Sequence, residues 1–91
     1  MFEYDPEKSA INLVKHGIDF EAAQALWKDS DRIDGPATSI NEARRMVVGL
    51  IDGRIWAAVV MDRGEKIRII SVRRARGKEA KAYDSQDDFG N

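Results

Sequence analysis

The dipeptide Asp52-Gly53 restricts the fold of this chain more than any other feature, because it separates two segments with strand patterns. Asp-Gly accepts the positive φ angles of a two-residue hairpin turn at little cost. Arg44 to Ile51 alternates before it, and Arg54 to Met61 is apolar on both faces after it. The pattern predicts a hairpin whose second strand is central in its sheet. The expected pairs are Ile51 with Arg54, Leu50 with Ile55, and Val48 with Ala57.

Two short helices are predicted before this hairpin. Asp5 is a good N-cap, Pro6 suits the first helical position and Gly17 suits the end, which predicts a helix over about residues 6 to 16. Asp19 can cap a second helix over about residues 20 to 28. The buried stripe of that helix would consist of Phe20, Ala23, Leu26 and Trp27. Both helices are short and amphipathic, so they need a sheet on which to pack.

Other segments predict further strands. Met1 to Tyr4 precedes Asp-Pro and can form only a short edge strand. A very short strand is expected around Arg32 to Asp34, within a loop. A turn over Asp62 to Glu65 leads to a strand over Lys66 to Val72.

The last element, over about Arg74 to Tyr83, reads as a helix that Gly77 interrupts early, at a cost of about 1 kcal/mol relative to alanine. The predicted fold class is therefore α+β: a short N-terminal strand, two helices, an antiparallel β-meander of three to four strands and a C-terminal helix. The 91 residues suffice for one small domain, expected over residues 1–84. Residues 85–91 are expected to form a frayed tail.

The composition favours a cytoplasmic protein. The chain contains no cysteine, so it has no disulfide framework and no thiolate chemistry. Its longest apolar run, Ile55 to Met61, is far too short for a membrane span, and its acidic start lacks the regions of a signal peptide. No membrane association is expected.

Positive charge is concentrated in one segment. Residues 63–81 hold eight lysines and arginines against two glutamates, a local charge of +6 in a chain of net charge −1. Such segregation indicates a surface that binds a polyanion. The alternative is that these cations form ion pairs with the acidic first half of the chain, where residues 1–42 carry four bases and nine acids.

Arg68 stands inside an apolar strand pattern. A four-residue turn at Asp62 to Glu65 would place Val59 opposite Arg68. Arg68 would then share a face with Met46, Val48, Leu50, Ile55, Ala57, Ile70 and Val72. An unpaired guanidinium is costly there, so Arg68 must reach the rim, pair with a carboxylate or meet a ligand anion. One more residue in the turn would reverse the face.

Several side chains could carry chemistry on a phosphodiester. Arginine suits bidentate phosphate binding and stabilises charge in phosphoryl transfer. The candidates of this type are Arg63, Arg68, Arg73 and Arg74. Glu79 and Tyr83 lie one helical turn apart, with Arg76 on the same side, and can form either an acid/base group or a surface ion pair beside a packing tyrosine.

His16 is the only histidine of the chain. It can act as a general base or a phosphate contact, or it can satisfy carbonyl groups at the end of its helix. No second histidine and no cysteine are available, so no metal site is expected. The chain has no P-loop, dinucleotide fingerprint or nucleophile elbow, and no cofactor is expected.

Three stretches resemble the BrnT family of type II toxins. They are the opening FEYDPEKSAINLVKHGIDFEAA, the central RRMVVGLIDGRIWAAVVMDRGEKIRIISVRRA, and the closing spacing of Ala75, Glu79 and Tyr83. The resemblance runs from about Phe2 to Tyr83, which is nearly the whole chain. KHGI after a DPxK start, with RIISVRRA about fifty residues later, is a specific combination.

The resemblance implies a RelE-like fold and an endoribonuclease that inhibits translation without a metal. The RNA 2′-OH would attack the adjacent phosphate and leave a cyclic phosphate. The implied catalytic residues are Arg63, Arg68, Arg73 and Arg74 on the phosphate, with Glu79 or His16 exchanging protons. The implied RNA-binding residues are Lys66, Arg76, Lys78 and Tyr83.

The resemblance also implies a BrnA-like antitoxin with a ribbon-helix-helix region. The toxin and antitoxin would form a heterotetramer that represses its own promoter and contacts DNA only through the antitoxin. The sequence leaves open whether the RNA is cut on the ribosome. The alternative is a non-catalytic binding module that docks such a partner in a repressor complex. A DNA-binding regulator acting alone is disfavoured, because no helix-turn-helix pattern is present.

Overall fold

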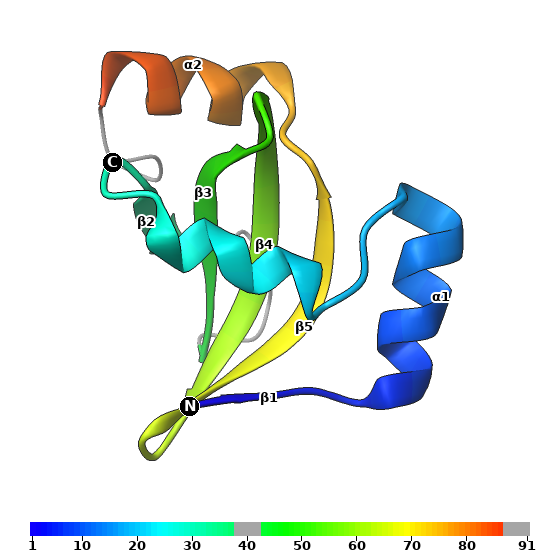
Figure 1. Cartoon of the computed structure of the whole chain (residues 1–91). Coiled ribbons are helices and arrows are strands. Elements are labelled where there is room, and N and C mark those ends of the chain that lie inside the picture. Colours follow the sequence, from blue (N-terminus) through cyan, green and yellow to red (C-terminus); the bar gives the residue numbers. More distant parts are fainter. Residues whose placement is uncertain (38–42, 87–91) are drawn as a thin grey trace.

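The computed structural model describes residues 1–37 and 43–86, and it confirms the α+β class (Figure 1). The described strands are β1 (Phe2–Glu3), β2 (Ile33–Pro36), β3 (Arg44–Ile51), β4 (Arg54–Arg63) and β5 (Lys66–Arg74). The helices are α1 (Pro6–His16), the 3₁₀ helix η1 (Ala22–Lys28) and α2 (Gly77–Ser85). Residues 87–91 of the expected tail lie outside the described residues.

The described strands form one mixed sheet in the order β1-β5-β4-β3-β2. The strands β2 to β5 follow one another as antiparallel neighbours. β1 joins the other edge in parallel with β5, where Phe2 lies opposite Ile67 and Glu3 lies opposite Arg68. The N-terminal edge strand is therefore paired with the last strand of the chain.

The hairpin between β3 and β4 has the predicted register. Asp52 and Gly53 form its turn, with φ angles of 49° and 79°. Positive φ at both central residues is typical of the turn whose twist matches that of the flanking strands. All three expected pairs are confirmed, from Ile51 with Arg54 to Val48 with Ala57.

The predicted register of the next hairpin is wrong. β4 continues to Arg63, so Gly64 and Glu65 alone form the turn, and Met61, not Val59, lies opposite Arg68. Further along, Val60 pairs with Ile69 and Val59 pairs with Ser71, which leaves Ile70 as an extra residue on β5. Such a β-bulge shifts the alternation of side chains by one position. Arg68 therefore lies on the expected face, whereas Val72 lies on the opposite one.

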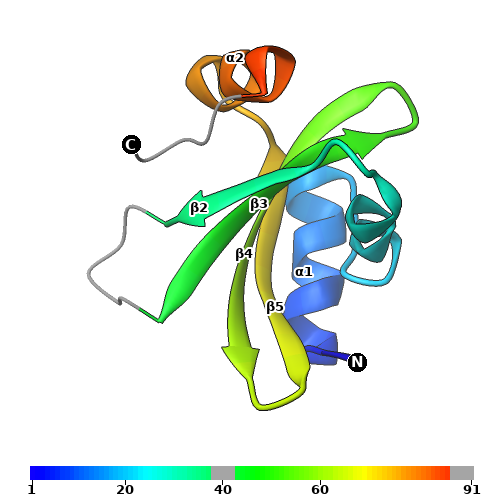
Figure 2. The ribbon, with the colours of Figure 1, turned by 90° about the vertical axis from the view of Figure 1, so that its left-hand side faces the viewer.

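The helices cover the two faces of the sheet unequally. We call the face covered by α1 and η1 the α1 face, and the face that contacts α2 the α2 face (Figure 2). The core of the α1 face contains Phe20 and Leu26 of the η1 region against strand residues that include Val47, Ala58, Val60, Ile69 and Val72. The core of the α2 face consists of Ile33, Met46, Val48 and Ala57, with Ala82 and Tyr83 of α2 packed on it.

Helix α1 has its predicted bounds but an unusual distribution of polarity. The Asp5 side chain accepts a hydrogen bond from the Glu7 amide, and Gly17 ends the helix at a φ of 81°. Its buried residues are the polar Ser9 and Asn12, whereas Ile11, Leu13 and Val14 are exposed. Ser9 accepts from the amide of Phe20, and Asn12 bonds to the backbone of Ile18 and Val72. Hydrogen bonds thus dock α1 on the sheet.

The other two helices depart from their predicted forms. The second helix is a 3₁₀ helix that begins at Ala22, and its N-cap is Glu21, not Asp19 as predicted. Asp19 still accepts a hydrogen bond from the Ala22 amide at 2.8 Å. α2 begins at Gly77, so this glycine opens the helix and does not interrupt it. No helix in the described part of the chain is long and apolar enough to cross a membrane.

Candidate functional site

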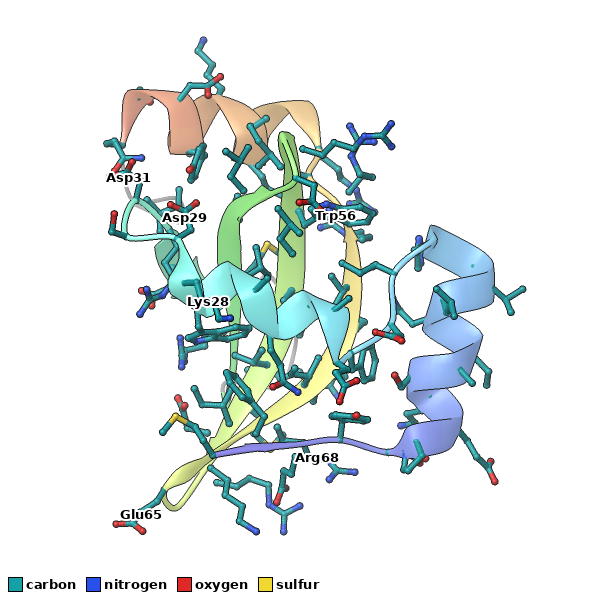
Figure 3. All side chains as sticks on the ribbon, viewed as in Figure 1. Lys28, Asp29, Asp31, Trp56, Glu65 and Arg68 are labelled. Atoms are coloured by element: carbon teal, nitrogen blue, oxygen red, sulfur yellow. The ribbon has the colours of Figure 1, made fainter. Side chains whose placement is uncertain are left out.

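The arginines of β5 and of the end of β4 divide into two groups. Arg63 and Arg68 lie near the turn, and Arg73 and Arg74 lie near the start of α2. Five residues of extended chain separate Arg68 from Arg73 by roughly 17 Å. In Figure 3, Arg68 lies beside β1 near the lower end of the sheet, and Trp56, which is opposite Arg74, lies near the upper end.

The lower group is organised by a carboxylate that sequence reasoning did not identify. One oxygen of Glu3, Oε2, lies 3.3 Å from Nη1 of Arg63 and 3.3 Å from Nη1 of Arg68. The register explains the contact, because Glu3 is the direct neighbour of Arg68 across the parallel pairing. Of the three options for Arg68, pairing with a carboxylate is therefore the one realised.

The same row continues across the sheet. Arg68 lies opposite Met61, and Met61 lies opposite Arg44 at the start of β3. Around this row is a pocket of about 250 Å³. Its walls are Asp5, Lys8, Arg44, Met61, Arg63, Arg68, Ile69 and Ile70. Four cations line the pocket with one carboxylate, and Glu3 contacts two of these cations, so four positive and two negative charges give a local charge of +2.

In the upper group, Arg73 forms an ion pair on the α2 face. Arg73 donates from Nη1 to Oε1 and from Nη2 to Oε2 of Glu79, each at 2.8 Å, and the Arg76 amide also donates to Oε1. The hydrogen bonds from Arg73 lower the pKa of Glu79 below its ordinary value, against the opposing effect of burial, and the Arg76 amide adds to the lowering. Glu79 is therefore ionised at neutral pH, and both of its carboxylate oxygens already accept hydrogen bonds.

Tyr83 lies on the same helix but faces another partner. Its hydroxyl donates to Oδ2 of Asp29 at 2.6 Å, at the point where the end of η1 meets α2. This hydrogen bond, together with burial, raises the pKa of Tyr83 to about 12. The Asp29 carboxylate also accepts from the amides of Leu50 and Asp31. Tyr83 thus ties α2 to the η1–β2 connection, and its phenol is neutral at physiological pH.

The remaining predicted residues are dispersed. The guanidinium carbon of Arg74 lies 5.6 Å from the ring centroid of Trp56, a cation–π contact. Lys66 opens β5 and Lys78 lies in the first turn of α2, both exposed. His16 lies in the last turn of α1. Among the described residues, no hydrogen bond or ion pair joins His16 to the arginines or to Glu79, so its proton-transfer role stays a prediction.

Sequence reasoning did not identify three residues that lie beside the lower group: Glu3, Lys8 and Arg44. Lys8 belongs to the DPxK start, which indicates a helix and the family but no site, and Arg44 opens a strand whose alternation indicates only its apolar face. No local signal links them, because they come from β1, α1 and β3 and meet only in the folded chain. Within residues 1–37 and 43–86, no group of three or more histidine, cysteine or acidic side chains could hold a metal ion.

The fold and the site together define a small α+β protein with an arginine-rich anion pocket at one end of its sheet. Residues 4–79 match the model of a known family, the ribonuclease toxin BrnT of type II toxin-antitoxin systems. The chain belongs to this BrnT family. A comparison with curated proteins finds no match. The resemblance inferred from the sequence is thereby confirmed, and with it a toxin that has RNA as its substrate and an antitoxin as its partner.

Proposed function

We propose that this toxin is an endoribonuclease that cleaves RNA by attack of a 2′-OH on the adjacent phosphodiester, without a metal ion. The observation that carries the proposal is the position of Glu3 Oε2, held between Arg63 and Arg68 at 3.3 Å from each. A carboxylate oxygen and a phosphate oxygen make the same charge-assisted hydrogen bonds to guanidinium groups. This carboxylate oxygen therefore marks where a non-bridging phosphate oxygen would bind.

The reaction requires a group that stabilises charge on the phosphate. The 2′-oxygen forms a bond to phosphorus, and the bond from phosphorus to the 5′-oxygen breaks. The 2′-OH loses its proton to a base, and a proton is delivered to the departing 5′-oxygen. The products are a 2′,3′-cyclic phosphate and a 5′-OH. Arg63 and Arg68 would stabilise the extra negative charge on the phosphate oxygens during this step.

The residues that take the proton from the 2′-OH and deliver one to the 5′-oxygen are proposed as candidates only. Glu79 accepts from Arg73 and from the Arg76 amide, so it can take up a proton only if Arg73 moves. Glu3 contacts both arginines of the lower group, which makes it a second carboxylate to test. His16, Arg73 and Arg74 remain predicted catalytic residues. Lys66, Arg76, Lys78 and Tyr83 remain predicted RNA contacts.

The proposed antitoxin is a BrnA-like protein with a ribbon-helix-helix region, in a heterotetramer with this toxin. The proposal includes the RelE-like fold and a cytoplasmic location. Co-expression of the toxin with the protein encoded next to it should abolish toxicity, and size-exclusion chromatography with light scattering should give the mass of a 2:2 complex. Toxicity that persists, or a complex of another stoichiometry, would contradict this part of the proposal.

The catalytic proposal is tested with labelled RNA, free and on ribosomes, with and without EDTA. We expect cleavage that EDTA does not affect and products that end in a 2′,3′-cyclic phosphate. Arg68→Ala should lower the rate about 10²-fold or more, because a group that stabilises the transition state is lost. Arg54→Ala is the matched control, since Arg54 is exposed at the other end of β4. No cleavage of either substrate would favour the non-catalytic binding module.

A further inference from the structure

Four cations from different elements line the pocket at the end of the sheet. Lys8 comes from α1, Arg44 from β3, Arg63 from the end of β4 and Arg68 from β5. We propose that this pocket binds a phosphate group of the RNA, and that Lys8 and Arg44 are phosphate-binding residues of the toxin. The inference rests on the proposed function for the identity of the ligand. It adds two residues that the family resemblance and the sequence did not indicate.

Arg44 carries a buried nitrogen that lacks a partner. Within the described part of the chain, its Nε is the one buried side-chain nitrogen or oxygen with no hydrogen bond. Buried donors are nearly always paired, because an unpaired one forfeits its hydrogen bonds to water. The neighbouring Arg45 shows the contrast, since its Nε donates to Asp62 at 2.8 Å. Arg44 lines the pocket, so a rotation of its side chain towards a ligand oxygen would give this buried Nε the kind of partner that Asp62 gives Arg45.

The sheet register brings Arg44 and Arg68 into range of one ligand. They flank Met61 in a single row across three strands, so their Cα atoms are about 10 Å apart. Arginine side chains of this length can converge on one group between them. The residue between them is Met61, which places no competing charge in the row.

Two carboxylates offset part of this positive charge without cancelling it: Asp5 in the pocket wall, and Glu3, which contacts Arg63 and Arg68. Asp5 caps α1, and its Oδ1 accepts from the Glu7 amide at 2.9 Å. That cap also fixes the first turn of α1, which carries Lys8 to the pocket. The pocket of about 250 Å³ is smaller than the pockets of about 300–1,000 Å³ that enclose drug-sized ligands. Its size and charge fit a phosphate with part of its sugar.

Binding can be measured without cleavage. The probes are inorganic phosphate and a 2′-O-methyl RNA, whose blocked 2′-oxygen cannot attack the phosphate. Isothermal titration calorimetry gives the affinities, and amide chemical shifts locate the site. The variants are Lys8→Ala and Arg44→Met. The matched controls are Lys15→Ala on α1 and Arg54→Ala on β4, two exposed residues outside the pocket.

We expect each pocket variant to weaken 2′-O-methyl RNA binding about tenfold, the loss of one charge-assisted contact. The controls should change it less than about twofold. Phosphate should shift the amides around Lys8 and Arg44 in the native protein. Arg44→Met should keep or raise the melting temperature, because it removes a buried unpaired donor. A residue with a purely structural role would lower the melting temperature instead.

The outcomes test the phosphate pocket and the cleavage reaction separately. Unchanged RNA affinity in both pocket variants, or phosphate shifts elsewhere on the surface, would overturn the pocket assignment even if the toxin cleaves RNA. Pocket-dependent binding without any cleavage would retain the assignment and contradict the proposed reaction. Binding of phosphate but not of RNA in the pocket would also overturn the assignment, because the ligand would then be a free anion.

Discussion

The side-chain amide of Asn12 pairs with both backbone groups of Val72. Its Nδ2 donates to the Val72 carbonyl at 2.9 Å, and its Oδ1 accepts from the Val72 amide at 3.2 Å. The same Nδ2 donates to the Ile18 carbonyl at 2.8 Å. The Asn12 side chain thus supplies the hydrogen bonds that a neighbouring strand would give to the backbone of β5. It does so at Val72, beyond Arg68, where the pairing with β1 ends. One helical side chain completes the edge of the sheet.

Asn12→Ala should destabilise the protein by about 2–4 kcal/mol, because it leaves buried backbone groups of Val72 and Ile18 without partners. Chemical denaturation measures the free energy of unfolding. Asn12→Asp keeps the size but replaces the donor with an oxygen that faces two carbonyl groups, so it should be at least as destabilising at pH 7. Val14→Ala, at an exposed position of the same helix, is the control. A loss below about 0.5 kcal/mol for Asn12→Ala would contradict this role.

The ion pair of Glu79 and Arg73 predicts a pH dependence. The pKa of Glu79 is lowered from 4.5 in the folded state, so the pair stabilises the fold above about pH 4.5 and loses this effect as the pH falls through the lower, folded value. Glu79→Gln should cost about 1.5–3 kcal/mol at pH 7. The difference in unfolding free energy between native and variant proteins should shrink towards pH 2. A difference that stays constant across this range would contradict the assignment.

The hydrogen bond from Tyr83 to Asp29 predicts an alkaline titration. The pKa of Tyr83 is raised to about 12, so its stabilising effect is complete below about pH 10 and is lost as the pH rises towards 12. Absorbance of tyrosinate should show one tyrosine that titrates near pH 12. Tyr83→Phe should remove this transition and lower the free energy of unfolding by about 1–3 kcal/mol. Tyr4→Phe, as the control, should leave the transition in place.

Glu3 should compete with RNA for Arg63 and Arg68. Glu3→Gln removes the carboxylate that contacts both guanidinium groups and raises the local charge by one. We expect severalfold tighter binding of 2′-O-methyl RNA at low salt, because binding depends on neutralised phosphates. Fluorescence anisotropy across a salt series measures this change. Glu65→Gln, in the exposed β4–β5 turn, controls for net charge alone. Weaker binding in Glu3→Gln would show that the carboxylate positions the arginines.

The sequence predicts local turn chemistry well and long-range register poorly. The Asp52-Gly53 hairpin follows from two residues that both accept positive φ, and its three predicted pairs are confirmed. The second hairpin contains a β-bulge at Ile70, and nothing in the apolar run around Ile70 marks an extra residue. The parallel pairing of Phe2 and Glu3 is equally hidden, because a two-residue strand carries no periodicity.

The candidate site shows the same limit. Arg68 was identified because a charge inside an apolar pattern requires an explanation, and Glu3 is its partner. Lys8 and Arg44 each look ordinary in their own segments, at the start of a helix and of a strand. Lys8 and Arg44 come together only through the strand register that aligns Arg44 with Arg68 and through the packing of α1 on β5. Neither can be predicted from the spacing of residues along the chain.

The parallel pairing of β1 with β5 has a consequence for synthesis on the ribosome. The Met1 carbonyl accepts from the Ile67 amide at 2.8 Å, so the first residues have no strand partner until roughly three quarters of the chain has been made. At about 5–20 residues per second, that delay is about 3–13 s. Glu3 meets Arg68 through the same pairing. A message broken before codon 68 therefore yields a chain that lacks Arg68, in which Glu3 has no strand partner and the anion pocket cannot assemble.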